Sequence, residues 1–545
     1  MKKAVAVLIS LGMAIGLLSG CGGSKDAGES SSASGKVTTF TINSTTPNAT
    51  FNTPTGKVLT EKTGLKFDYM TVIGGSDEAR QKYEVWLASG DFPDVLAIDP
   101  SMTAKYRDAG AIIPLEDLIG QYGPNIKKKF GKFYELLRDP DGHIYSIFAP
   151  NLSEKVPNAQ ASFVVQYEVL KEAGYPEIKT FDQLHDILKD YVKKHPKLDG
   201  QDVIPFSSPD PARTYMNAPI AAAGQPDHGE FIIDKDQNVH LAVTDPLTKD
   251  FYKFLNTLNN EGMLDKELFS LTWESFSAKA AQGRILAGFV PQWIMGGIEN
   301  SLTAAGKFDQ LYAKFPIHIN DSIEDHTNTI TPTNSTNNWC ITNKVKNPEK
   351  IIQFIDYLFT DEGQELTAWG IEGKHFEKKD GKRTVMEAFA KERAENPTVD
   401  AQEGYGSYSW FTFGNGSKLE EGDWATPTNP DTVEASYAPK TKEVLAKYGK
   451  QVWADFLPAP EYIPTFTWQL NAPSEYKGIW NKLEQVIYRG AARVILAEND
   501  SQFESEWNDL QQQLEKSGQK KAEELWTKTW KSYLETYNKA VQSQE

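Results

Sequence analysis

The chain has 545 residues, 39% of them hydrophobic and 24% charged, so we expect two or more lobes with large cores and exclude both wholesale disorder and a polytopic membrane protein. The formal net charge is −17, from 57 Lys and Arg against 74 Asp and Glu. Because a nucleic-acid surface needs clustered Lys and Arg, we expect no nucleic-acid partner and favour a neutral or cationic solute. The only cysteines, Cys21 and Cys340, exclude a disulfide framework and a cysteine-based metal site.

The first 36 residues predict export and attachment to a membrane. Lys2 and Lys3 precede an uncharged apolar run over residues 4–18, which suits a secretory leader and is too short for a spanning helix. Residues 18–21 (LSGC) resemble the bacterial lipobox, so residues 1–20 are predicted to be a lipoprotein signal peptide, and the thiol of Cys21 is predicted to carry the lipid. Residues 21–36 are rich in Gly and Ser and predict a flexible tether. We therefore expect a globular body held at the extracellular face of a bacterial cell membrane, with Cys340 buried.

The body opens with strands and helices in alternation. These elements are expected over residues 37–43, 54–63, 65–72, 77–88 and 94–98. The alternation predicts right-handed crossovers and a parallel sheet, in which ligands gather at the carboxyl ends of the strands. Thr45, Asn48 and Asp99 follow two of these strands and are candidate ligand-binding residues.

From about residue 160 a second series of strands and helices begins. We expect a strand over 162–167, a helix from the capping box at 180–183 through 194, a hairpin over 231–241 and a helix from Pro246 to Gly262. Farther along, residues 348–368 predict an amphipathic helix, and the tail from 473 onward is predicted to be helical almost throughout. This second α/β run predicts a second lobe.

Several short motifs follow one another in a fixed order. They are residues 88–94 (ASGDFPD), 110–115 (GAIIPL), 258–265 (LNNEGMLD), 361–363 (DEG) and 370–373 (GIEG). Together with the lipobox they resemble the family 1 extracellular solute-binding lipoproteins, the receptor components of ABC importers. The resemblance implies an α/β, periplasmic-binding-protein-like fold of two lobes, each a mainly parallel sheet flanked by helices. Hinge crossings would join a first lobe of 37–155 and 340–400 to a second of 156–339 and 401–545.

The resemblance also implies a function. A lipid-anchored, monomeric receptor would capture an oligosaccharide between its closing lobes and deliver it to the permease subunits of an ABC importer in the membrane, with no catalytic residue and no cofactor. Two alternatives stay open: a lipid-anchored glycoside hydrolase or lyase, because a carboxylate pair has no fixed local spacing, and a non-catalytic surface glycan adhesin.

No metal site is predicted. Alginate- and glycosaminoglycan-binding relatives carry a calcium loop at the place of residues 195–206, where this chain has only two carboxylates, Asp199 and Asp202. A calcium ion binds six to eight oxygen ligands, so we expect no calcium site in this segment. Residues 234–238 imitate a calcium loop, but Val239 stands where the turn glycine is required, and a hairpin turn explains the segment better.

Aromatic and polar residues are the candidate sugar contacts, because the C–H face of a pyranose lies well on an aromatic plane while its hydroxyls need polar partners. For each tryptophan, packing in the core is the alternative. The mixed polarity favours a neutral oligosaccharide over a uronic polymer. The candidate platforms are Trp273, Trp293, Trp339, Trp410 and Phe411. The polar candidates are Asp210, Arg213 and Asn217, in and after a proline-rich loop, with Thr45, Asn48 and Asp99 facing them from the other lobe.

Overall fold

The computed structural model describes residues 37–46, 49–74, 76–139, 141–157, 161–396 and 398–542. The predicted signal peptide, the tether and Cys21 lie outside the described residues, as does Asn48. Within the described part of the chain, no helix is both long and apolar enough to cross a lipid bilayer.

A mixed sheet of five strands lies in the first of two large cores. Its strands are β1 (Thr38–Ser44), β2 (Leu65–Thr71), β3 (Val95–Ile98), β4 (Ile147–Pro150) and β14 (Thr333–Ile341). The order is β2-β1-β3-β14-β4. β1 is parallel to β2 and β3, whereas β14 is antiparallel to β3 and β4, so β14 runs against the direction of the other four.

Side chains of this sheet alternate between two hydrophobic clusters, one on each face. Trp339 and Ile341 of β14 enter one cluster, and Cys340 between them enters the other. Cys340 is fully buried, as predicted, and burial raises the pKa of its thiol to about 12. The ASGDFPD motif sets the register of β3, because the Asp94 carboxylate accepts hydrogen bonds from both the N–H and the hydroxyl of Thr41 on β1, each at 2.8 Å.

Helices pack on both faces of the first sheet, and a small hairpin with two helices follows them in the chain. The helices are α1 (Pro54–Thr63), α2 (Ser76–Ser89), α3 (Pro100–Asp108), α4 (Glu116–Tyr122), α5 (Pro124–Phe130), η1 (Gly131–Leu137), α12 (Pro348–Leu358), α13 (Asp361–Gln364) and η6 (Glu365–Trp369). The elements that follow are β15 (Phe376–Lys379), β16 (Lys382–Val385), α14 (Glu387–Glu395) and α15 (Val399–Glu403).

A second mixed sheet of four strands lies in the other large core. Its strands are β5 (Ala161–Gln166), β8 (Ile204–Ser207), β11 (Ile285–Pro291) and β12 (Tyr312–Phe315). The order is β12-β5-β11-β8, with β11 parallel to β8 and β5 antiparallel to both of its neighbours. Each sheet thus contains one reversed strand, β14 or β5, and in both cases it is the strand by which the chain enters that sheet from the other one.

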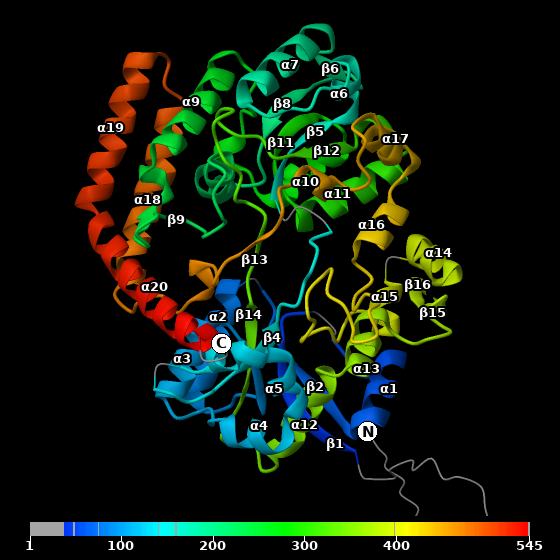
Figure 1. Ribbon diagram of the computed structural model, residues 1–545. Coiled ribbons are helices and arrows are strands. Elements are labelled where there is room, and N and C mark those ends of the chain that lie inside the picture. Colours follow the sequence, from blue (N-terminus) through cyan, green and yellow to red (C-terminus); the bar gives the residue numbers. More distant parts are fainter. Residues whose placement is uncertain are drawn as a thin grey trace, which may run out of the picture. The chain divides into compact units, whose positions relative to one another are not determined.

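The second core collects the remaining helices and hairpins. Helices α9, α18 and α19 lie side by side along it (Figure 1). The helices are α6 (Tyr167–Glu172), α7 (Phe181–Lys194), η2 (Arg213–Asn217), α8 (Ala218–Ala222), η3 (Ala242–Thr244), α9 (Pro246–Asn260), η4 (Leu268–Ser270), α10 (Trp273–Ala281), α11 (Gln292–Ala304), η5 (Phe308–Gln310), α16 (Pro430–Ser436), α17 (Pro439–Lys447), η7 (Trp453–Phe456), η8 (Thr467–Gln469), α18 (Tyr476–Ile495), α19 (Asp500–Lys516) and α20 (Gln519–Gln542). The short strand pairs are β6 (Lys197–Leu198) with β7 (Gln201–Asp202), β9 (Phe231–Ile233) with β10 (Val239–Leu241), and β13 (Thr329–Ile330) with β17 (Glu461–Tyr462).

The chain passes between the two sheets after β4 and returns before β14. The predicted lobe boundary at 340 falls inside β14, which belongs to the first sheet. Tyr408, Phe411 and Phe413, which the sequence prediction gave to the second lobe, pack in the first core. The terminal helix α20 also joins the cores, because the Tyr537 ring stacks on Phe133 of η1 with ring centres 6.1 Å apart.

The α/β fold is confirmed, but one predicted helix is interrupted. The amphipathic segment 348–368 ends its first helix at Leu358, and Thr360 caps the next through a hydrogen bond from the Gly363 N–H at 3.0 Å. The break brings two backbones close, because a Cβ on Gly363 would lie 2.1 Å from the Tyr357 carbonyl oxygen. Hydrophobic spacing alone does not reveal such a contact.

Candidate functional site

The parallel pair β8 and β11 places a polar loop and the start of a helix at one edge of the second sheet. β11 is buried along its whole length and pairs with β8 at Gly288 and Ser207. A Cβ at position 288 would lie 2.2 Å from the Ser207 carbonyl oxygen, so only glycine permits this approach. The loop after β8 leads to Arg213, and the turn after β11 leads to Trp293. Both residues therefore stand at the carboxyl ends of parallel strands, where ligands bind in α/β folds.

Trp293 and Trp273 form an exposed aromatic pair. Trp293 lies in the first turn of α11 and is 61% exposed, and Trp273 is the first residue of α10 and is 49% exposed. Their rings meet edge to face with centres 5.7 Å apart. Thr272 caps α10 in a reciprocal capping box with Ser275, which fixes the start of the helix that carries Trp273. Two indoles so exposed are free to take a ligand on their outer faces.

Arg213 borders this pair, and Asn217 lies on the same widened helical turn. They are the first and last residues of η2, a π-helix, and such turns recur at functional sites. The Arg213 guanidinium lies 6.0 Å from the centre of the Trp293 ring, in cation–π range. Its backbone N–H donates to the Asp210 carboxylate at 3.0 Å, so Asp210 shapes the turn. The Asn217 amide donates to Asp227 at 3.4 Å.

A third exposed indole, Trp468, is linked to Asn217 through Asp227. Trp468 is 44% exposed, and its Nε1–H donates to the Asp227 carbonyl at 3.1 Å. Its ring stacks on Phe466 with centres 5.6 Å apart and also contacts the position of Gly229. We name the set of Trp273, Trp293, Trp468, Arg213, Asn217 and Asp227 the tryptophan surface. It combines aromatic platforms with groups that donate and accept hydrogen bonds.

Asp227 on this surface and Glu230 close by in the chain have raised pKa values. Desolvation raises the pKa of Asp227, although the residue is exposed. The hydrogen bond from the Gly229 N–H and the positive charge of Arg213 oppose this rise. Desolvation likewise raises the pKa of Glu230, whose carboxylate accepts a hydrogen bond from the Tyr476 hydroxyl at 2.6 Å. Glu484 and Asp227 add to that rise by repulsion. A polar ligand here would meet acids that are held close together.

Three of the predicted platforms lie elsewhere, in the aromatic part of the first core. Trp339 and Phe411 are each 2% exposed, with ring centres 5.1 Å apart. Trp410 is partly buried and packs 4.9 Å from Trp339 and 6.4 Å from Phe51. Because the faces of Trp339 and Phe411 are covered by neighbouring rings, neither can stack on a sugar, and this burial removes both from the candidate set.

The polar residues predicted on the first lobe have different settings. Thr45 is exposed just after β1. Asp99 caps α3: its carboxylate accepts from the Ser101 and Met102 N–H groups and from Arg80 at 3.1 Å. Burial opposes its ionisation, but the hydrogen bonds from Ser101 and Arg80 outweigh burial and lower the pKa of Asp99. Among the described residues, no hydrogen bond or ring contact joins Thr45 or Asp99 to the tryptophan surface.

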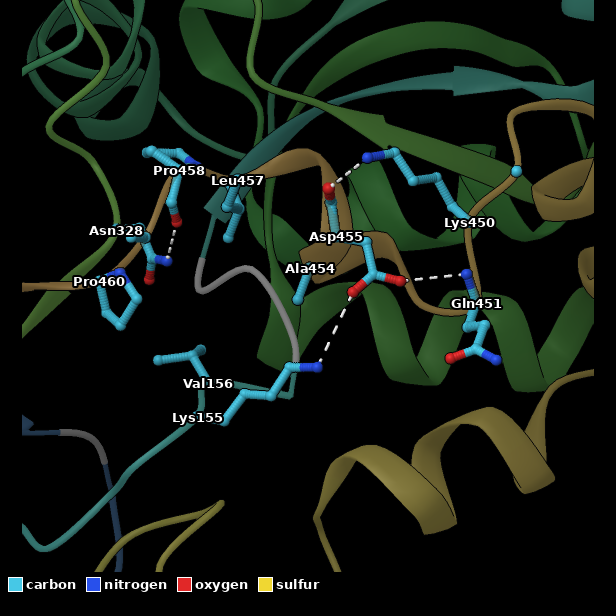
Figure 2. Close-up of a pocket in the computed structure, with 12 residues that line it drawn as sticks. Lys155, Val156, Asn328, Lys450, Gln451, Ala454, Asp455, Leu457, Pro458 and Pro460 are labelled. Carbon is cyan, nitrogen blue, oxygen red and sulfur yellow. Dashed lines mark hydrogen bonds and ion pairs between the residues drawn. The ribbon is translucent and has the colours of Figure 1, made fainter.

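A pocket of about 610 Å³ lies beside the segments that link the two sheets (Figure 2). Lys155 comes from the segment after β4, and its Nζ lies 3.9 Å from the Asp455 carboxylate. Asn328, just before β13, donates to the Pro458 carbonyl at 2.7 Å. The described residues that line this pocket include no aromatic ring, so it offers no stacking platform. The tryptophan surface is therefore the better candidate for a sugar site.

Residues 195–206, where no calcium site was expected, contain a tight hairpin. β6 and β7 are joined by Asp199 and Gly200, both with positive φ, as in a type I′ hairpin turn. The Lys307 ammonium lies 3.1 Å from Asp199 and donates to the Gln282 carbonyl at 2.8 Å. In the described part of the chain, no three His, Cys, Asp or Glu side chains are grouped to hold a metal ion.

Sequence reasoning missed Trp468, Asp227 and Glu230. Trp468 follows the run 458–466, which has no clear period and which the sequence left unassigned. Asp227 lies in the short turn before the predicted hairpin, where polar residues are ordinary. The only available signal was the aromatic pair Phe466 and Trp468 near Pro464, which is weak by itself.

The sequence profile of the bacterial extracellular solute-binding proteins matches residues 43–365. The fructooligosaccharide ABC transporter substrate-binding protein FusA of Streptococcus pneumoniae is 26% identical over 334 residues, 58% of this chain and 59% of FusA. The match thus spans less than two thirds of that relative. Lipoprotein LipO of Bacillus subtilis is 24% identical over 402 residues, 70% of this chain and 75% of LipO.

Solved structures share the fold. An extracellular solute-binding protein from Bifidobacterium longum subsp. infantis has a TM-score of 0.68 at 17% identity, covering 92% of this chain and 99% of that one. The structure of FusA from Streptococcus pneumoniae in complex with kestose has a TM-score of 0.63 at 20% identity, covering 91% and 99%. The likeness establishes the fold class that the sequence predicted.

Proposed function

The chain belongs to the family of bacterial extracellular solute-binding proteins, and we propose that it is the lipid-anchored receptor of an ABC importer that captures an oligosaccharide on the tryptophan surface. It would hand the sugar to permease subunits in the membrane. We propose Cys21 as the lipid-bearing residue and a monomer as the functional form.

The exposure of three indoles beside polar groups carries this proposal. Trp273, Trp293 and Trp468 are 49, 61 and 44% exposed, whereas the described tryptophans of the terminal helices α19 and α20 are at most 7% exposed. Exposed indoles beside hydrogen-bonding groups suit pyranose rings, whose C–H faces stack while their hydroxyls bond. The name of one relative supports a sugar ligand, because FusA is named for fructooligosaccharides and was solved with kestose.

We propose further that the linking segments act as hinges between two lobes. The first lobe would hold the five-stranded sheet and the rest of the chain up to Phe413, except for the segment from β5 to β13. The second lobe would hold that segment, with its four-stranded sheet, and the terminal helices. A ligand that touches both lobes only when they close shifts the population toward the closed form. The description of the family as solute-binding proteins supports a binding role rather than turnover.

A thermal-shift screen of the full-length lipoprotein tests the proposal. The protein is purified in a zwitterionic detergent, because glycoside detergents carry a sugar. The panel holds maltotetraose, cellotetraose, nystose, tetragalacturonate and a tetrapeptide. A ligand at 100 times its Kd stabilises the folded protein by about 2.7 kcal/mol, and at least one saccharide is expected to raise Tm accordingly.

The same samples separate binding from catalysis. After overnight incubation, chromatography of the saccharides is expected to show each one intact. Release of shorter sugars would identify a hydrolase or lyase instead. A Tm raised only by the peptide, or by nothing in the panel, would refute oligosaccharide capture.

A further inference from the structure

The charged groups around the tryptophan surface are unequal in number. Four carboxylates, those of Asp210, Asp227, Glu230 and Glu484, interact electrostatically with one another, with Arg213 or with the tyrosines between them. Arg213 is the one cation in this network of described groups. Full ionisation would leave this network with three more negative than positive charges.

The single cation is already engaged. The Arg213 guanidinium lies 6.0 Å from the Trp293 ring centre, and its charge opposes the raised pKa of Asp227. Asp210 accepts the backbone N–H of Arg213 and interacts electrostatically with Tyr488. A ligand carboxylate would compete for Arg213 while meeting the other acids, whereas a ligand ammonium would find several acceptors.

Two tyrosines lie beside these carboxylates. Burial and the charges of Glu484 and Asp210, partly opposed by Arg213, raise the pKa of the Tyr488 hydroxyl to about 12. The Tyr476 hydroxyl donates to Glu230 and is also repelled as an anion by Glu484. Tyr488 and Tyr476 both lie on α18, so this helix contributes two hydroxyls beside the carboxylates.

From this imbalance we propose that the tryptophan surface selects oligosaccharides by charge. Chains that bear protonated amines bind more tightly than neutral ones, and uronic chains bind most weakly. This inference rests on the proposed function, because it names the ligand class of the same surface. Asp227 is the main discriminating residue, since it is exposed and lies between the Arg213 turn and Trp468.

Matched probes test the order of affinity. The neutral saccharide with the largest Tm shift among maltotetraose, cellotetraose and nystose is converted to its 6-amino-6-deoxy and its C6-oxidised forms. Calorimetric titration of the full-length lipoprotein at pH 7 and low salt then compares three Kd values. We expect the amine to bind about tenfold more tightly than the neutral form and the carboxylate about tenfold more weakly, each equal to about 1.4 kcal/mol. Both differences are expected to shrink in high salt.

Two variants locate the cause. Asp227→Asn is expected to reduce the ratio of carboxylate to amine Kd at least threefold. Asp236→Asn, which removes one exposed carboxylate from the turn between β9 and β10, is expected to leave the ratio unchanged. A carboxylate form that binds as tightly as the neutral form, or a ratio that Asp227→Asn does not change, would overturn charge selection while leaving sugar capture intact. Absence of binding by every saccharide would instead refute the proposed function itself.

Discussion

Truncation of the most exposed indole measures how much a stacked sugar contributes to affinity. Trp293 is 61% exposed, so of the roughly 250 Å² that a tryptophan side chain offers, about 150 Å² faces solvent. A sugar ring on one face would cover about half of that area, and at about 25 cal/mol per Å² the contact contributes about 2 kcal/mol. Trp293→Ala is therefore expected to raise the Kd about 30-fold.

Calorimetric titration with the best saccharide of the panel is the assay. Trp293→Phe keeps an aromatic plane and is expected to recover most of the affinity. Phe308→Ala, at a 39% exposed ring on η5, is the control for loss of a surface aromatic outside the tryptophan surface and is expected to bind like the parent. Because Trp293 is exposed, the Tm without ligand is expected to change little. A Trp293→Ala protein that binds within twofold of the parent would refute the stacking argument.

Four further predictions follow from the described contacts. Trp339→Ala is expected to lower the free energy of unfolding, measured in urea, by about 3–5 kcal/mol and to leave the sugar affinity of the folded protein unchanged. A marked loss of affinity would show that Trp339 belongs to the binding site. Gly288→Ala is expected to lower both Tm and sugar affinity, because the added Cβ would clash with the Ser207 carbonyl oxygen. Gly296→Ala on α11, where an added Cβ would meet no atom within 4 Å, is expected to leave both unchanged or to raise Tm. Folding raises the pKa values of Asp227 and Glu230, so the folded state holds more protons and stability falls as pH rises above the ordinary carboxyl range. Asp227→Asn with Glu230→Gln is expected to flatten this fall in urea midpoints, and an unaltered slope would contradict the assignment. EDTA is expected to leave Tm unchanged, and a fall that calcium reverses would show a structural metal.

Local patterns were sufficient to predict most of the secondary structure. The helix over 54–63 follows from its Thr53 cap, Pro54 and the Gly64 terminator, all of which are local signals. The parallel pair β1 and β2 follows from the helix between them. The reversed directions of β5 and β14 were not predicted, because the direction of each strand depends on where the chain crosses between sheets, and no local period records that.

Local patterns also predicted only part of the candidate site. Trp293 and Arg213 could be singled out because each follows a buried strand, and the parallel pairing of β8 with β11 brings their loops together. Trp339 could not be excluded in advance, because burial depends on the rings of Phe67 and Phe354, which come from distant parts of the chain. Trp468 is linked to the rest of the tryptophan surface by its hydrogen bond to the Asp227 carbonyl, which lies 241 residues earlier in the chain.

A crystal structure of the full-length protein with its best-binding saccharide tests the central claim most directly. We predict sugar rings packed at about 4 Å against Trp293, Trp273 or Trp468, with hydroxyls bonded to Asn217 or Asp227. A sugar seated in the pocket beside Lys155 and Asn328, with the three indoles still facing solvent, would contradict the account.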